Sequence, residues 1–85
     1  RERMGEEYDG VMSGVTRWGL YVELANTVEG LVHVADMRDD HYEFVEQDYE
    51  LVGEHTGRTY KLGQSVRVRV TDADKVQRTV NFEIV

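Results

Sequence analysis

The sequence RWGLYVEL, residues 17–24, has the alternation of a half-buried β-strand. Apolar side chains occupy one parity of this segment and polar or amphipathic ones the other: Leu20, Val22 and Leu24 against Tyr21 and Glu23. A period of two residues turns the first set toward a core and the second toward solvent. The segment therefore predicts one strand of a β-fold.

Trp18 interrupts this pattern. It has the parity of the core positions, yet it stands beside Arg17 at the start of the strand and is followed by Gly19. Large aromatic side chains are most often packed in a core. A glycine can instead permit a β-bulge that resets the two-residue count and turns the ring outward. The residues alone leave both positions open.

Four other segments have strand patterns, at residues 8–17, 28–34, 66–70 and 80–84. Gly10 and Gly14 in the first of them indicate a strand that bends. This strand leads directly into the strand at 18–24, and a polar turn leads on to the next, so the three predict a meander. A polar loop at 71–79 joins the last two strands.

A long insertion lies at residues 35–62, and short local structures are expected within it. They are a helical turn at 35–37, a hairpin within 43–52 and a short strand at 59–62. Helical periodicity of any length is missing from the sequence, which argues against a helix bundle or an α/β fold. We predict one all-β domain, 1–85, with a five-stranded antiparallel barrel at about 5–34 and 63–85, because closing the sheet removes its exposed edges.

The net charge of −7 comes from the insertion. Residues 36–54 contain eight acids and one arginine, whereas the other 66 residues contain nine acids and nine bases. The remainder of the chain is therefore neutral. A nucleic-acid partner is not excluded by the overall charge.

Composition also bears on the cellular compartment of the chain and on membrane association. It has no cysteine, which fits a reducing compartment, and we expect a cytoplasmic monomer. No apolar run approaches the roughly 20 residues that span a bilayer, so no membrane partner is expected. The chain begins at Arg1 and ends on a strand pattern at 81–85, so we expect it to be a piece of a longer protein.

Residues suited to catalysis or metal binding are few. The sequence has no cysteine nucleophile, no G-x-S-x-G motif and no glycine-rich phosphate loop. Its three histidines and two serines stand at unremarkable spacings: His33, His41, His55, Ser13 and Ser65. Asp36, Asp39, Asp40 and His41 could form a metal cluster, but such a charge run is usually a solvated face. We predict no catalytic residue, metal site or cofactor in this chain.

The outer face of the barrel offers a surface for single-stranded nucleic acid, in which bases stack on rings and cations hold the backbone. The candidate rings are Trp18 and Tyr21, with His33 on the next strand, and the candidate cations are Arg67, Arg69 and Arg78. Each has an ordinary structural alternative. The rings could be packed, the histidine structural, the strand arginines merely solvated, and Arg78 could form a loop ion pair with Asp74.

Motifs in a fixed order resemble a known family. They are Tyr8-x-Gly10, Trp18-Gly19-x-Tyr21-Val22, Glu29-Gly30-Leu31-Val32-His33-Val34 and Gly63-x-x-Val66-x-Val68-x-Val70. This order resembles the S1 RNA-binding domain over nearly the whole chain. The resemblance implies an OB-fold barrel whose RNA surface combines two aromatics, a histidine and a D-x-x-x-R pair before the last strand.

Matched residue by residue, the resemblance implies RNA-binding roles for Trp18, Tyr21, His33, Asp74 and Arg78. The loop before the last strand is one residue longer than is usual in the family, which leaves Asp72 as an alternative to Asp74. Trp18 is then predicted to share the outer face with Tyr21, with a bulge or bend at Gly19.

The sequence of the insertion makes the family resemblance more specific. Residues 41–44, 49–63 and 79–85 resemble the C-terminal S1 domain of the ribonuclease R family. This implies a parent protein that is a magnesium-dependent 3′-to-5′ exoribonuclease, with its metal-binding aspartates in a separate domain. The chain would be a non-catalytic module that holds single-stranded RNA and contacts other domains of the parent. The alternative is a protein-interaction module that docks through its acidic insertion.

Overall fold

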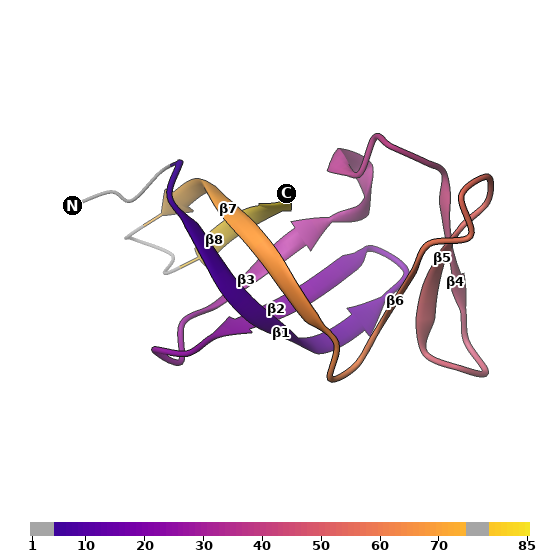
Figure 1. Cartoon of the computed structure of the whole chain (residues 1–85), viewed down its shortest axis with the longest axis horizontal. Helices are drawn as coiled ribbons and strands as arrows, with labels where there is room; N and C mark the ends of the chain where they lie inside the picture. Colours follow the sequence, from indigo (N-terminus) through magenta and orange to yellow (C-terminus); the bar gives the residue numbers. More distant parts are fainter. Residues whose placement is uncertain (1–4, 75–78) are drawn as a thin grey trace.

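The barrel is built from five strands of the chain. The computed structural model describes residues 5–74 and 79–85, with only the backbone of residues 73, 74 and 79. The strands form a closed barrel in the order β1-β2-β3-β8-β7 (Figure 1). Their bounds are Glu7–Thr16 (β1), Gly19–Leu24 (β2), Glu29–His33 (β3), Ser65–Asp74 (β7) and Thr79–Ile84 (β8). The predicted five-stranded all-β barrel is confirmed.

Strand directions follow from the number of strands in the ring. β1, β2 and β3 form the predicted antiparallel meander, and β7 is antiparallel to both β1 and β8. An odd number of strands cannot close with every neighbour antiparallel. The exception is the seam between β3 and β8, which is parallel and has one registered residue pair, Leu31 with Asn81. The predicted antiparallel barrel thus contains one parallel pairing, at this seam.

The first strand bends, as predicted, and so reaches two neighbours. The register between β1 and β2 shifts between Met12 and Gly14, so Ser13 forms a bulge. Residues 7–11 pair with β7, while the part of β1 from Gly10 onward pairs with β2. Because of this bend, β1 pairs with both β2 and β7.

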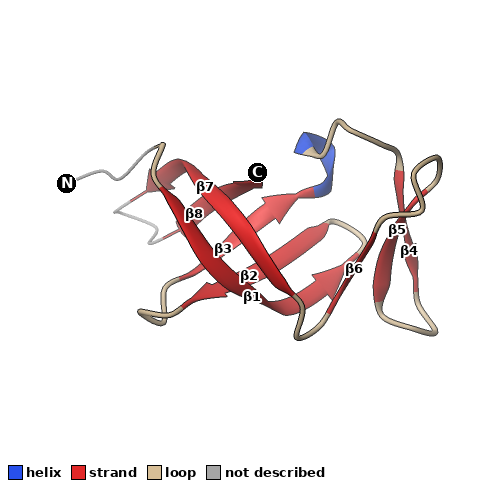
Figure 2. Cartoon of the chain, in the orientation of Figure 1, coloured by secondary structure: helices blue, strands red, loops and turns tan. Residues whose placement is uncertain are grey.

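The insertion forms a second small sheet beside one end of the barrel (Figure 2). A 3-10 turn at Val34–Asp36 (η1) comes first, and the strands Tyr42–Val45 (β4), Glu50–Gly53 (β5) and Thr59–Lys61 (β6) then pair in the order β4-β5-β6. The expected turn, hairpin and short strand are all present. The union of the three strands in one sheet was not foreseen.

One hydrophobic core connects the barrel with the insertion. Leu20, Val22 and Phe82 lie at the centre of the barrel, and the same cluster continues into the insertion through Met37, Tyr42, Leu51 and Tyr60. The rings of Tyr42 and Tyr60 lie with centroids 5.6 Å apart. Burial, together with hydrogen bonding to Asp39, raises the pKa of Tyr42. The insertion is therefore packed as part of the domain.

The last two strands are longer than the sequence predicted. β7 continues to Asp74 past a register shift between Val70 and Asp72, and β8 begins at Thr79. The predicted polar loop at 71–79 is wrong at both ends, because residues 71–74 belong to β7 and Thr79 to β8, and its middle, 75–78, lies outside the described residues. The shift in register interrupts the alternation that marked β7, so the polar residues after Val70 did not show their strand character in the sequence.

Candidate nucleic-acid interface

Trp18 lies in the tight turn between β1 and β2, outside both strands. Its side chain is 72% exposed, which confirms the predicted outward position. Of the predicted bulge or bend, no bulge occurs at Gly19, and the chain turns just before it, at residues 17–18. Gly19 is the first residue of β2 and pairs in register with Thr16 and His33. Trp18 departs from the alternation because it belongs to the turn.

Hydrogen bonds fix the backbone of this turn. The amide N–H groups of Trp18 and Gly19 donate to the hydroxyl oxygen of Thr16 at 3.1 and 3.2 Å. The carbonyl oxygen of Trp18 accepts a hydrogen bond from the Val34 amide at 2.8 Å, which ties the turn to the end of β3. The exposed ring thus extends from an ordered backbone.

Gly19 allows β2 and β3 to approach closely at this point. A methyl group at residue 19 would overlap the carbonyl oxygen of Val32 and would lie 3.2 Å from the Cα of His33. Only glycine leaves that space free. The close approach places the backbone of His33 directly across from the residue that follows Trp18.

A groove of about 420 Å³ crosses β2, β3 and β8 on the outer face of the barrel. Tyr21 (41% exposed) and the exposed His33 both line it. The remaining lining residues are Glu29, Gly30, Leu31, Val80 and Asn81. Asn81 was not among the predicted site residues, although its outward parity between Val80 and Phe82 could have indicated it. The structure brings together two of the five residues implied by the family resemblance, with Trp18 in the adjoining turn.

The two strand arginines lie elsewhere on the barrel. Arg67 pairs with Asp9 at 3.1 Å and with Glu7 at 3.6 Å. Arg69 pairs with Glu83 at 2.6 Å and with Glu7 at 3.1 Å. The carboxylates raise the pKa of both guanidinium groups, chiefly through the hydrogen bonds that Arg67 donates to Asp9 and Arg69 donates to Glu83. Both arginines face outward as predicted, but acidic neighbours already engage their charges.

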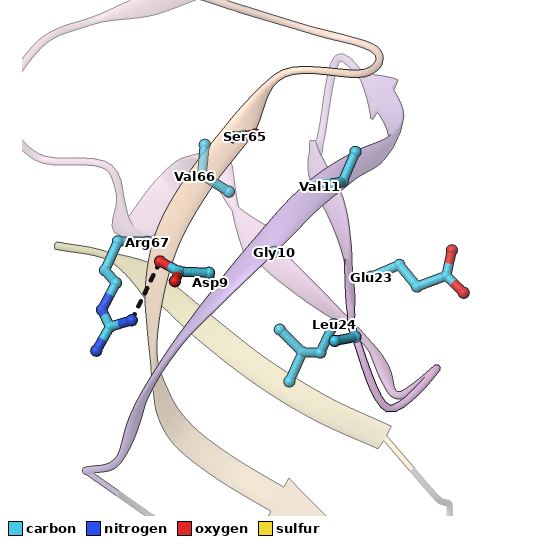
Figure 3. Close-up of a pocket in the computed structure, with 9 residues that line it drawn as sticks. Asp9, Gly10, Val11, Glu23, Leu24, Ser65, Val66 and Arg67 are labelled. Carbon is cyan, nitrogen blue, oxygen red and sulfur yellow. Dashed lines mark ion pairs between the residues drawn. The ribbon is translucent and has the colours of Figure 1, made fainter.

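Arg67 also borders a different cavity, of about 630 Å³, on the face of β1, β2 and β7 (Figure 3). The figure shows the ion pair of Arg67 with Asp9 beside Gly10 and Val66. Neither Trp18, Tyr21 nor His33 lines this cavity. Arg67 is therefore not brought to the groove.

The predicted D-x-x-x-R pair, Asp74 and Arg78, is only partly described by the structure. Arg78 lies outside the described residues, and Asp74 is described only as the last residue of β7, where it pairs with Thr79. The alternative aspartate, Asp72, is exposed and lies opposite Asn81 of the groove. The choice between Asp72 and Asp74 stays a prediction.

Arg17 is a neighbour of the site and was not among the predicted site residues. Its guanidinium carbon lies 5.8 Å from the ring centroid of Trp18 and 6.0 Å from that of Phe44, within the range of cation–π contacts. Phe44 belongs to β4 of the insertion. Only the adjacency of Arg17 to Trp18 was visible in the sequence, because the partner from the insertion is 27 residues away.

The acidic residues considered as a metal cluster have structural partners. Both oxygens of Asp40 accept hydrogen bonds, from the backbone amides of His41, His55 and Thr56 and from the Thr56 hydroxyl, at 2.7–3.1 Å. Partial burial raises the pKa of Asp40, but these hydrogen bonds outweigh it and hold the pKa well below its usual range. Asp39 accepts hydrogen bonds from Tyr42 and Arg58, both at 2.9 Å. Among the described residues, no group of three or more histidines and carboxylates is placed to hold a metal ion.

No helix in the described part of the chain has the length and apolar character needed to cross a membrane.

The fold and the groove agree with a family match. The S1 RNA binding domain family matches residues 2–84. The chain belongs to this family and is an S1 RNA-binding domain.

Several proteins similar to this chain are named ribonuclease R. Ribonuclease R 1 of Lactococcus lactis subsp. lactis (strain IL1403) is 42% identical over 82 residues, and the ribonuclease R of Aquifex aeolicus (strain VF5) is 43% identical over 84 residues. The matches cover 96% and 98% of this chain but 10% and 12% of the relatives. The chain is thus homologous to a domain of ribonuclease R, and it spans about a tenth of the length of these relatives.

Solved structures support the same fold. The apo form of Mycoplasma genitalium RNase R and its complex with ribose methylated single-stranded RNA each match with a TM-score of 0.88 and 23% sequence identity. Each match covers 96% of this chain and 13% of the other. At this identity the likeness concerns the fold alone.

Proposed function

We propose that the 85 residues act as a single, monomeric domain that binds single-stranded RNA across β2, β3 and β8. The observation that carries this proposal is the exposed ring of Trp18 on an ordered turn beside a groove lined by Tyr21 and His33. Stacking on such rings tolerates any base, because every base has a π-face. Asn81 adds an amide that can donate and accept hydrogen bonds within the same groove.

Each residue has a stated role in this proposal. Trp18 and Tyr21 stack on bases, and His33 contacts the backbone or a base edge. Arg78 contributes a cation from the segment between β7 and β8, and Asp74 or Asp72 orients it or accepts a hydrogen bond from a ribose hydroxyl. Arg67 and Arg69 contribute less, because their guanidinium groups are already held by carboxylates.

The wider setting is part of the same proposal. The relatives are named ribonuclease R, and the domain would belong to a 3′-to-5′ exoribonuclease of the cytoplasm that acts in RNA degradation. Catalysis and its magnesium ions would lie in another domain of the parent. The S1 domain would hold substrate RNA near that domain without taking part in the reaction.

RNA titration tests the proposal directly. Trp18 is the only tryptophan in the chain, so quenching of its fluorescence by an unlabelled oligoribonucleotide would report stacking on that ring. Anisotropy of a labelled oligoribonucleotide measures the affinity in parallel. Loss of one stack costs about 1–3 kcal/mol, so Trp18→Ala is expected to weaken binding about 5- to 150-fold.

A matched control separates stacking from general disturbance. Val11→Ala also truncates an exposed apolar side chain of the barrel, but Val11 lines the cavity on the other face. It is expected to bind RNA as the wild type does. Unchanged binding by a folded Trp18→Ala variant would exclude the stacking role.

Because the domain is acidic overall, its RNA binding is expected to be weak and sensitive to salt. Tight binding whose affinity does not change with salt would contradict the mechanism.

A second candidate function is protein docking through the acidic insertion. It is favoured by the arrangement of the small sheet, which packs Leu51 and Tyr60 into the core and leaves Glu43 and Glu46 exposed. These carboxylates could face a basic surface of the parent protein. Chemical-shift mapping separates the candidates, since RNA is expected to move the signals of Trp18, Tyr21 and His33, whereas a protein partner would move those of residues 38–60.

A further inference from the structure

Arg17 is an exposed cation beside the ring of Trp18. Three other arginines, Arg58, Arg67 and Arg69, each form an ion pair with a carboxylate at 3.1 Å or less. Arg17 forms none within residues 5–74 and 79–85. It contacts the two aromatic rings, whose centroids lie 5.8 and 6.0 Å from the guanidinium carbon, and a guanidinium carries five N–H donors.

The position of Arg17 is defined from two sides. Trp18 is the next residue in the turn, and Phe44 approaches from β4 of the insertion. Phe44 is itself packed against the core, and its ring meets that of Tyr49 edge-on at 6.2 Å. The small sheet therefore supports one wall of the site in which the guanidinium lies.

The planar fork of N–H donors on a guanidinium matches the oxygens of a phosphate. A nucleotide stacked on Trp18 would carry its phosphates within reach of the neighbouring residue in the turn. Beyond Phe44 the small sheet exposes carboxylates, at Glu43 and Glu46, which repel an RNA backbone. Arg17 thus stands where the barrel surface meets the acidic one.

We infer that Arg17 binds a backbone phosphate next to the nucleotide stacked on Trp18, and that Phe44 is a positioning residue for Arg17. This inference rests on the proposed RNA-binding function. It gives the insertion a part in RNA binding without direct contact between the acidic sheet and the RNA. The RNA-binding surface extends to Arg17 and ends there.

Salt dependence provides the test of the phosphate contact. For single strands, each phosphate contact contributes about 0.7 to the slope of log K against log salt. Arg17→Gln is therefore expected to reduce the slope by about 0.7 and to weaken binding about fivefold at 0.1 M salt. Arg17→Lys retains the charge and is expected to keep the slope. Arg58→Gln is the matched control, because it removes an exposed arginine of the insertion that is ion-paired with Asp39, and it should leave affinity and slope unchanged.

Phe44 is tested through a double-mutant cycle. Phe44→Leu keeps an apolar side chain against the core but removes the ring that faces Arg17. It is expected to weaken RNA binding in the wild-type background and to have no further effect in Arg17→Gln. An equal loss in both backgrounds would overturn the positioning role. Circular dichroism of every variant confirms that the compared proteins are folded.

The outcomes separate this inference from the proposal on which it rests. If the wild type binds no RNA, the proposed function fails and the inference fails with it. If Trp18→Ala weakens binding while Arg17→Gln keeps the wild-type affinity and slope, only the inference is overturned.

Discussion

Replacing Gly19 by alanine should damage the junction between the exposed turn and β3. The added methyl would meet the carbonyl oxygen and carbon of Val32 and the Cα of His33, all of them backbone atoms. To restore ordinary contact, β2 and β3 would have to separate by about 1 Å. Backbone atoms held by strand pairing on both sides cannot rotate away as a side chain can.

The expected cost can be worked out from these contacts. Overpacking costs about 1–3 kcal/mol, and a clash with backbone belongs at the upper end. Alanine recovers about 0.4–1 kcal/mol by restricting the unfolded chain. The net loss of unfolding free energy is about 2 kcal/mol, which for a domain of this size lowers the melting temperature by about 8–16 °C.

Thermal and urea unfolding followed by far-ultraviolet circular dichroism measure this change. Gly14→Ala is the matched control, because its methyl would meet only the ring and Cβ of Tyr21, at 3.0 Å and beyond. That ring is partly exposed and can turn aside, so a loss below about 1 kcal/mol is expected. A Gly19→Ala variant that melts at or above the wild-type temperature would refute the close-approach argument.

Two further predictions concern the insertion. Leu51→Ala removes a fully buried side chain of β5 and should lower the free energy of unfolding by about 2–5 kcal/mol, within one cooperative transition. Leu62→Ala, at an exposed position, is the control and should lower it by less than about 0.5 kcal/mol. Two separate transitions in urea would contradict a shared core. The ionised form of Asp40 favours the folded state, because its folded pKa lies below the ordinary value near 3.8. That contribution is complete above pH 3.8 and is lost as the pH falls toward the folded pKa, so Asp40→Asn should unfold more easily at neutral pH and show a shallower loss of stability in acid; acid titrations of the two proteins with the same slope would be inconsistent with this role.

Alternation predicted the barrel well because each of its strands has one buried and one solvated face. Leu20 and Val22 define the inner side of β2 by period alone, and both are completely buried. The same rule failed at the end of β7, where the register shift after Val70 breaks the period. It also assigned the exposure of Trp18 to a bulge, since a two-residue turn and a bulge reset the count in the same way.

The candidate site was predictable where one residue type carries the signal. Tyr21 and His33 stand out as exposed rings on neighbouring strands, and Trp18 as an exposed ring in the turn before β2. The roles of the cations were harder to predict, because a cation is available to RNA only if the fold does not pair it with a carboxylate. Arg67 and Arg69 face outward as predicted but meet Glu7, Asp9 and Glu83 across strand pairs. Arg17 contacts Phe44 of the insertion. This contact joins residues far apart in the chain, so the spacing of residues in the sequence does not predict it.

The parallel seam between β3 and β8 has a consequence for the opening of the barrel. With one registered residue pair, Leu31 and Asn81, it joins segments that are 50 residues apart in the chain. The groove crosses this seam, so a bound RNA strand would contact both sides and act as a clamp across it. Opening of the seam then requires release of the RNA, and amide hydrogen exchange in residues 29–33 and 79–84 should slow when RNA is bound.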